Sequence, residues 1–273
     1  ILSNQYTFLI LLMMLTALPV GFFAGLFGIG GGFIIVPFLY FIFEILGLDK
    51  MYIMHLSVGT SFAIIIPTSF VSVLTHKKNK GVDPNIIKSY AFYVIIGVIA
   101  GTSFASTLET KSLVLFFSLI VFILGSYLMF LKEKETNIKI KFNLLPKIIF
   151  GFLSGFISAP MGIGGAVMNI PVLKYFGYPI KKAIGSAASI GFIIALFGAI
   201  GFLISGSYLK ANLPLSIGFI NIPAFLIFVP ITTIMAKLGA NTVHKLDKNI
   251  VTKLFGIFLY LVGSVFLYRY FNI

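Results

Sequence analysis

Long apolar segments follow one another along the chain, separated only by short polar stretches. Most of them reach the roughly 18 apolar residues that a helix needs to cross a bilayer. Charged residues make up only 10% of the chain, against about 25% in soluble proteins. The pattern predicts an all-α polytopic membrane protein with eight to ten transmembrane segments, and the lack of period-two alternation excludes a β-barrel. The expected segments are 6–28, 30–46, 52–75, 86–108, 112–131, 147–160, 162–176, 182–206, 213–236 and 249–271.

Glycine clusters break the apolar pattern at two places, Gly28–Gly32 and Gly162–Gly165. The segments 147–160 and 162–176 beside the second cluster are each too short to cross about 30 Å of hydrocarbon alone. They form either one broken span or two half-helices of a hairpin. If both clusters are hairpin tips, sixteen of the 20 basic residues share one membrane face; if both are kinks, the split is eleven to nine.

The positive-inside rule therefore favours hairpins. It predicts that the lysine-rich loops face the cytoplasm and that both termini lie outside. The count leaves open whether a hairpin tip crosses the membrane or stops midway. The first twenty-one residues lack a basic n-region and a small-residue cleavage site, so we expect a retained span in the cell (inner or plasma) membrane.

The net charge of +13 resides in short loops between apolar segments. This distribution belongs to membrane topology, and it predicts no nucleic-acid partner. The chain has no cysteine, and its three histidines lie far apart, so we expect no metal ligands and no cofactor. No cluster combines a nucleophile with a base, which predicts no catalytic residues and a protein that is not an enzyme.

Comparison at fixed offsets indicates that the chain is duplicated. The stretch GIGGGFIIVP (28–37) aligns without gaps on GIGGAVMNIP (162–171), and VGTS (58–61) aligns on IGSA (184–187). Just before its glycine cluster, the second copy carries four extra residues, SAPM (158–161). Further matching pairs are GFFAGLF (21–27) with GFLSGFI (151–157), and 101–130 with 239–268.

On the hairpin interpretation each copy holds five segments. An odd number means that the two copies insert with opposite orientation, which is the inverted-repeat architecture typical of secondary transporters. We therefore expect a first transmembrane repeat at 1–131 and a second at 147–273. The most charged stretch of the chain, 132–146, is the expected cytoplasmic linker.

The glycine clusters predict a binding site made of backbone. Consecutive glycines let a chain unwind and turn, because they accept positive φ without steric cost. The helix that follows begins with amide N–H groups that lack partners, which attracts an anion. The alternative is close helix packing, which we expect for Gly21-x-x-x-Gly25, Gly97-x-x-x-Gly101 and Gly151-x-x-x-Gly155. The first cluster is no nucleotide-binding loop, since it does not match GxGxxG.

Hydroxyl and amide side chains beside the clusters could also face an anion. Thr60, Ser61 and Ser186 lie on the VGTS and IGSA stretches; the alternative for them is local bonding to the preceding helical turn. For Asn169 the alternative is a hydrogen bond between helices. The candidate substrate-binding residues are Gly28, Gly30, Gly31, Gly32, Thr60, Ser61, Gly162, Gly164, Gly165, Asn169 and Ser186.

All seven acidic residues fall at segment ends or in loops. Acids inside a membrane usually mark cation or proton pathways, so their positions here favour an anionic substrate over a cation. A proton or a sodium ion is the candidate for coupling transport to a gradient. Besides the substrate, the expected partner is the lipid bilayer.

The duplicated GLFGIGGGFIIVP and APMGIGGAVMNIP, the VGTS stretch and the terminal AKLGANTVHKL together resemble the sulfite exporter TauE/SafE family, the toluene-sulfonate uptake permeases. The resemblance covers essentially the whole chain. It implies a membrane transporter of sulfite, organosulfonates or related anions, with the glycine hairpins and the Gly-Thr-Ser stretch lining the path. The second copy departs from this pattern at Ala187. The sequence thus predicts an alternating-access carrier; an anion channel and a carrier of a non-sulfur organic anion are the alternatives.

Overall fold

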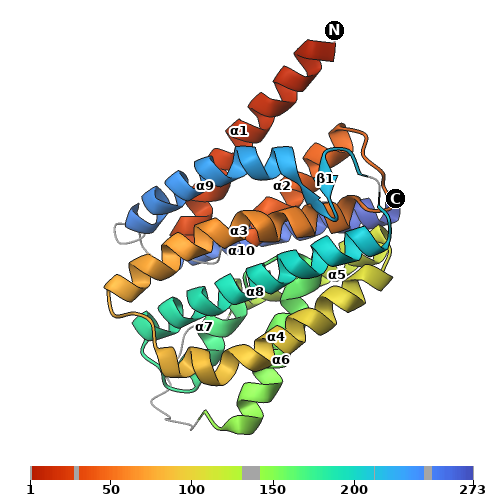
Figure 1. Ribbon diagram of the computed structural model, residues 1–273. Helices are drawn as coiled ribbons and strands as arrows, with labels where there is room; N and C mark the ends of the chain where they lie inside the picture. Colours follow the sequence, from red (N-terminus) through yellow and green to blue (C-terminus); the bar gives the residue numbers. More distant parts are fainter. Residues whose placement is uncertain (1, 28–30, 131–141, 212, 243–247, 273) are drawn as a thin grey trace.

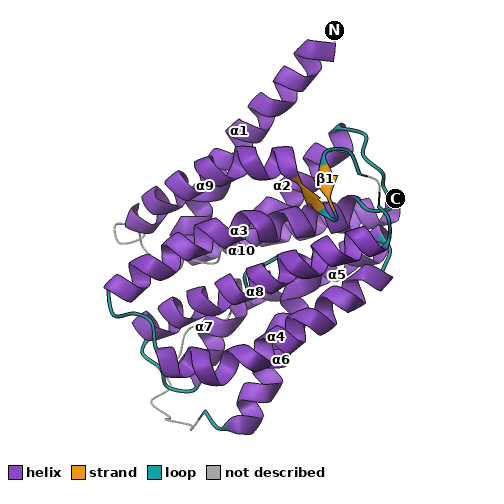
Figure 2. Cartoon of the chain, in the orientation of Figure 1, coloured by secondary structure: helices purple, strands orange, loops and turns teal. Residues whose placement is uncertain are grey.

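The computed structural model describes residues 2–27, 31–130, 142–211, 213–242 and 248–272. The described residues are almost entirely helical (Figures 1 and 2), which confirms the predicted all-α class. The helices are α1 (Leu2–Phe27), α2 (Gly32–Ile45), α3 (Ile53–Lys78), α4 (Pro84–Thr107), α5 (Thr110–Phe130), α6 (Leu144–Met161), α7 (Ala166–Tyr175), α8 (Ile180–Tyr208), α9 (Ile222–Thr242) and α10 (Lys248–Asn272).

Seven of the described helices are long and apolar enough to cross a membrane, namely α3, α4, α5, α6, α8 and parts of α9 and α10. The stretch Ile10–Gly25 of α1 and the helix α2 are also apolar but shorter. At about 1.5 Å per residue, the ten residues of α7 span only about half of the hydrocarbon core. The chain is therefore a polytopic helical membrane protein.

Two expected segments differ from the structure. Segment 147–160 was expected to be too short to span, but α6 begins at Leu144 and has 18 residues, because Pro146 is tolerated within a first helical turn. Segment 213–236 was expected to be one apolar stretch, but α9 begins only at Ile222. Before it, β1 (Ser216–Ile217) and β2 (Ile220–Asn221) form a small antiparallel hairpin, whose turn includes Gly218 at φ 55°.

The helices pack in pairs that join the two halves of the chain. α1 lies along α9, α4 lies along α6, and α5 lies along α10. In the centre, α3 and α8 lie side by side and run in opposite directions (Figure 1). Each of these pairs takes one helix from the first half of the chain and one from the second half. The described helices therefore form one packed unit.

Glycines bring the paired helices into contact. Cβ atoms added to Gly21 and Gly25 would overlap the backbone of α9 at Thr232 and Ala236. In the same way, Gly151 and Gly155 of α6 face α4, and Gly97 and Gly101 of α4 face the backbone of α6. The predicted packing role of the three GxxxG pairs is confirmed.

The ends of the helices gather at two ends of the bundle. At the left of Figure 1, α3 ends, α4 and α8 begin, and α9 ends. The loop before α4 there contacts the start of α8, where the Lys182 ammonium lies 3.3 Å from the Asp83 carboxylate. At the other end, the Arg269 guanidinium forms two 3.0 Å contacts with Glu44, and Lys111 lies over the Tyr270 ring.

Replacing Gly25 with alanine tests the contact between α1 and α9. The new methyl group would overlap the carbonyl of Ala236, so the two helices must separate, at a cost of about 1–3 kcal/mol. We expect a lower melting temperature for the purified protein in detergent. The control is Gly125→Ala, where the nearest atom to an added Cβ is 3.3 Å away and the protein should melt close to wild type. Equal melting temperatures for both variants would contradict the close contact.

Candidate functional site

Each glycine cluster ends in the same backbone geometry. Gly31 is the N-cap of α2 with φ 77°, and Gly165 is the N-cap of α7 with φ 64°. The two positions correspond in the alignment of GIGGGFIIVP with GIGGAVMNIP. Positive φ of this kind is costly for residues that carry a Cβ, so glycine is required at both places. The predicted unwinding is therefore present, and each break is followed at once by a helix start.

The first break (Gly28–Gly32) and the second break (Gly162–Gly165) touch each other through Gly32 and Gly162. A Cβ on Gly32 would overlap the carbonyl oxygen of Gly162 and would lie 2.7 Å from the Ile163 Cα. Gly162 itself ends α6 with φ 65°. The Ser61 hydroxyl, on α3, donates a hydrogen bond of 2.9 Å to the Gly162 carbonyl. The structure thus brings together three candidate residues from three different elements.

The rest of the second break lies against α8. A Cβ on Gly191 of α8 would lie 2.5 Å from the Gly164 carbonyl oxygen, and a Cβ on Gly165 would lie 2.5 Å from the Ile194 Cδ1. Residues 161–167 are all buried, and so are residues 31–37 of the first break. Buried surroundings of this kind are what non-helical backbone needs at membrane depth. The remaining candidates of the first break, Gly28 and Gly30, lie outside the described residues.

Asn169 takes part in a hydrogen bond between helices. Its Nδ2 donates to the Gly165 carbonyl at 2.9 Å, and its Oδ1 accepts from the Tyr90 hydroxyl of α4 at 2.9 Å. The side chain is fully buried. The amide therefore braces the N-cap of α7 against α4, which is the alternative considered for this residue. Sequence reasoning missed Tyr90, because no local pattern in α4 or α7 links two residues that lie so far apart along the chain.

Thr60 and Ser186 hold the segments that precede α9 and α4, at opposite ends of the bundle. The Thr60 hydroxyl accepts a hydrogen bond of 2.9 Å from the Asn221 N–H, and the Ser186 hydroxyl accepts one of 3.0 Å from the Asp83 N–H. Asp83 caps α4 by accepting from the Asn85 N–H, and Asn221 likewise accepts from Ala224 N–H near the start of α9. Each hydroxyl thus contacts the residue just before a helix, and Ser61 is the hydroxyl that contacts the second break.

Two buried serines near the second break were not among the candidates. Ser154 Oγ and Ser158 Oγ, both on α6, have no hydrogen-bond partner among the described residues. A Cβ on Gly165 would lie 3.0 Å from Ser158 Oγ, so this hydroxyl faces the N-cap of α7. Ser158 is the first of the four extra residues of the second copy, and that insertion was the sequence feature that could have identified it.

The charged side chains of the described residues lie away from the two breaks. Among the described residues, the buried polar side chains include no aspartate, glutamate, lysine or arginine. The described ion pairs lie near the ends of the bundle. Beside one of them, burial raises the pKa of the Tyr178 hydroxyl, Asp83 raises it further, and Lys182 lowers it. The breaks can therefore offer an anion only neutral donors and helix dipoles.

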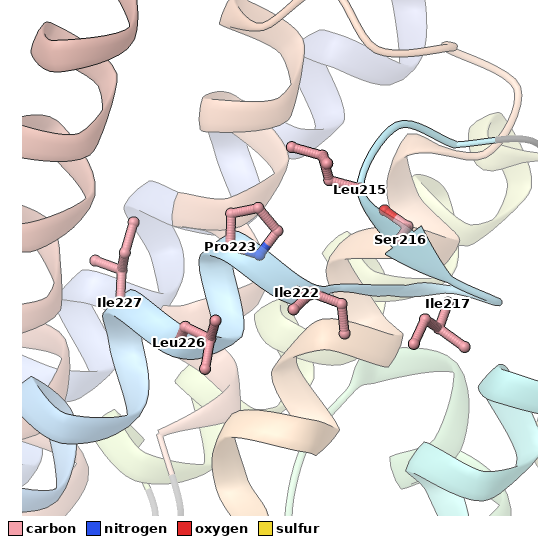
Figure 3. A pocket seen from close by; sticks show the side chains of 7 residues that line it. All are labelled: Leu215, Ser216, Ile217, Ile222, Pro223, Leu226 and Ile227. Carbon is pink, nitrogen blue, oxygen red and sulfur yellow. The ribbon is translucent and has the colours of Figure 1, made fainter.

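A groove of about 630 Å³ lies away from the breaks, beside the β hairpin and the start of α9 (Figure 3). It is lined by Leu215, Ser216, Ile217, Ile222, Pro223, Leu226 and Ile227. Its lining is almost entirely apolar, and Leu215 and Leu226 are 75% and 63% exposed. This groove contains none of the candidate residues.

The fold is that of a polytopic helical membrane protein. The chain belongs to the sulfite exporter TauE/SafE family, whose family model matches residues 13–266. This finding confirms the resemblance noted in the sequence.

Three relatives are similar over nearly their whole length. A "probable membrane transporter protein" of Haemophilus influenzae is 33% identical over 95% of this chain and 98% of its own. One of Methanocaldococcus jannaschii is 31% identical over 90% of this chain and 92% of its own. YunE of Bacillus subtilis, with the same description, is 26% identical over 94% and 97%. No solved structure matches the chain significantly.

Replacing Gly165 with alanine tests the second break. The substitution forces an L residue into the left-handed region and places a methyl group 2.5 Å from Ile194 and 3.0 Å from Ser158. We expect anion uptake in proteoliposomes to fall about tenfold or more, because small displacements at a binding site are costly.

The matched control is Gly47→Ala. Gly47 has φ 67°, which gives the same backbone strain, but an added Cβ meets no atom within 4 Å. This variant should transport close to the wild-type rate. If both variants lost transport equally, backbone strain alone would account for the effect, and the second break would have no special role.

Proposed function

We propose that the protein is a secondary carrier of small anionic sulfur compounds, such as sulfite or organosulfonates, and that it works by alternating access. The observation that carries this proposal is the contact between two helix-starting glycine breaks, Gly32 against Gly162, at the meeting point of both halves. Membership of the sulfite exporter family supports the substrate class. The proposed binding residues are the described members of the candidate set at the breaks: Gly31, Gly32, Ser61, Gly162, Gly164, Gly165 and Asn169.

The electrostatics of the breaks favour an anion. The first amides of a helix lack intrahelical partners, and the helix start carries about half a positive charge. Both α2 and α7 begin at a buried glycine N-cap, where little water competes for these groups. A buried carboxylate, which a cation would need, is missing from the described residues.

We propose that the halves 1–131 and 147–273 are inverted repeats joined by the linker 132–146. Matched contacts support this. Gly21 faces Thr232 as Gly151 faces Val94. Gly21 aligns with Gly151, and the offset that aligns 101–130 with 239–268 also relates Val94 to Thr232. The bond from Asn221 to Thr60 has its counterpart in the bond from Asp83 to Ser186. Repeats of opposite orientation can exchange conformations, which would open the shared site to either side in turn.

We further propose that the protein lies in the cell membrane with its lysine-rich end in the cytoplasm and both termini outside, and that a proton or sodium gradient drives transport. The sorting of the basic residues supports the orientation. Among the four basic residues assigned to the outer face, Lys111 and Arg269 lie at the end where α2 and α10 finish.

Cysteine labelling tests the orientation in cells that express the protein. The chain has no cysteine, so Lys78→Cys and Lys210→Cys each introduce a single thiol. A membrane-impermeant maleimide should label the position 210 variant in intact cells and the position 78 variant only after permeabilisation. Lys78 is the last residue of α3 and Lys210 follows α8, and these two helices run in opposite directions (Figure 1). The unmodified chain is the control. The reverse pattern would invert the proposed topology.

Flux into proteoliposomes tests the substrate class and the mechanism. We expect labelled sulfite to enter at a rate that saturates with concentration and that rises when unlabelled sulfite is present on the far side. Both properties follow from a site that faces one side at a time. Liposomes without protein are the control. Flux that does not saturate would indicate an anion channel, and flux of organic carboxylates alone would indicate a non-sulfur carrier.

A further inference from the structure

Most buried hydroxyls on the helices of this protein bond to the preceding turn. Ser57 donates to the Ile53 carbonyl at 2.7 Å, Ser69 donates to Ile65 at 2.7 Å, and Thr232 donates to Phe228 at 2.7 Å. Such bonds are the usual solution for a hydroxyl inside a membrane helix. Ser154 and Ser158 on α6 depart from it, since neither Oγ has a partner among the described residues.

A buried hydroxyl without a partner is costly, so two of them one turn apart need an explanation. Ser154 and Ser158 are 2% and 0% exposed. Because they are four residues apart, they lie on the same face of α6. Ser158 Oγ faces Gly165, the N-cap of α7, and the first amides of α7 at Ala166 and Val167 have no intrahelical acceptor. The Ser158 hydroxyl therefore lies beside the amide donors of α7, and Ser154 lies one turn before it on the same face of α6.

The sequence around the first break, residues 21–37, contains no serine or threonine. In the alignment of residues 21–27 with 151–157, Ala24 corresponds to Ser154. A Cβ on Gly31 would lie 2.7 Å from the Ala24 Cβ, whereas the atoms near Gly165 include Ser158 Oγ at 3.0 Å. The two breaks share a backbone geometry but differ in polarity. The second break is the polar one.

We propose that Ser158, Ser154 and the first amides of α7 form the oxyanion-binding site of this chain, and that this site selects a singly charged oxyanion. This inference rests on the proposed transport of sulfur anions and adds the residues and the charge of the ligand. A sulfonate group fits the chemistry, because its three oxygens can accept from both hydroxyls and from the helix start at once.

The selection for a single charge follows from the neutral donors. The cost of removing an ion from water rises with the square of its charge, while its attraction to fixed dipoles rises only in proportion. No lysine or arginine is among the buried side chains of the described residues to offset a second charge. A monoanion such as methanesulfonate should therefore bind better than a dianion such as sulfate.

Thermal unfolding of the full chain, purified in detergent, tests the proposal. Methanesulfonate is titrated at constant ionic strength against chloride, and sulfate is titrated in parallel. We expect methanesulfonate to raise the melting temperature of the wild type and sulfate to raise it less. Ser158→Ala should require about tenfold more methanesulfonate for the same shift, since it removes a hydrogen bond to a charged group.

The ligand-free melting temperature separates binding from a structural role. Removing an unpartnered buried hydroxyl should leave that temperature unchanged or raise it. A structural role would lower it and preserve the methanesulfonate shift. The control is Ser118→Ala on α5, because Ser118 is also fully buried but donates to the Leu115 carbonyl at 2.9 Å. This control should keep the wild-type response to methanesulfonate.

A second variant keeps the test decisive if Ser158→Ala does not fold. Ser158→Cys preserves the size of the side chain and introduces the only thiol in the protein. Methanesulfonate should slow the reaction of this thiol with a small alkylating reagent, and chloride should not.

A wild-type shift that Ser158→Ala retains in full would overturn the site, as would thiol labelling that methanesulfonate does not slow. Stabilisation by sulfate equal to or above that by methanesulfonate would overturn the selection for one charge. Failure of the wild type to transport or bind any sulfur anion would instead overturn the proposed function itself.

Discussion

Peptide groups that leave a helix inside a bilayer must find partners within the protein, and this requirement governs the arrangement of the whole chain. Two glycine breaks place such peptide groups inside the helix bundle. The described residues of each break are buried, and the second break is held by elements from other parts of the chain: Ser61 of α3 binds the Gly162 carbonyl, and Gly191 of α8 makes room for the Gly164 carbonyl. The antiparallel pair of α3 and α8 therefore supports the second break on two sides.

Small side chains make this support possible. Glycines on α1, α4 and α6 let helix backbones meet, and the missing Cβ of Gly32 lets the two breaks touch. Helices in lipid gain little from hydrophobic association, so close van der Waals contact and hydrogen bonds have to stabilise the bundle. The same residue type thus serves helix packing at the GxxxG pairs and backbone turns at the breaks, where Gly31, Gly162 and Gly165 take positive φ.

Hydropathy, glycine spacing and duplication predicted the helical class, nearly all helix positions and the backbone turn at each break, because these features are local in sequence. The hairpin of β1 and β2 was missed, since Leu215 to Ile222 is as apolar as a spanning helix. The hydrogen-bond partners of buried polar side chains were harder still to predict from the sequence. Nothing in the local pattern links Tyr90 to Asn169 or Ser186 to Asp83, and the unbonded state of Ser158 becomes visible only once every neighbouring carbonyl has a position.

The bonds of Thr60 and Ser186 have a consequence for motion. Asn221 donates its N–H to Thr60 while its side chain accepts from Ala224 at the first turn of α9, and Asp83 combines the same two tasks at the start of α4. A helix that moved away from α3 or α8 would lose the anchor of its own first residues in the same step. The residue just before α9 and the residue just before α4 are thus each bound to a helix of the other half of the chain. The same arrangement recurs on different segments at the two ends of the bundle, so each end joins the two halves of the chain through a bond of the same kind.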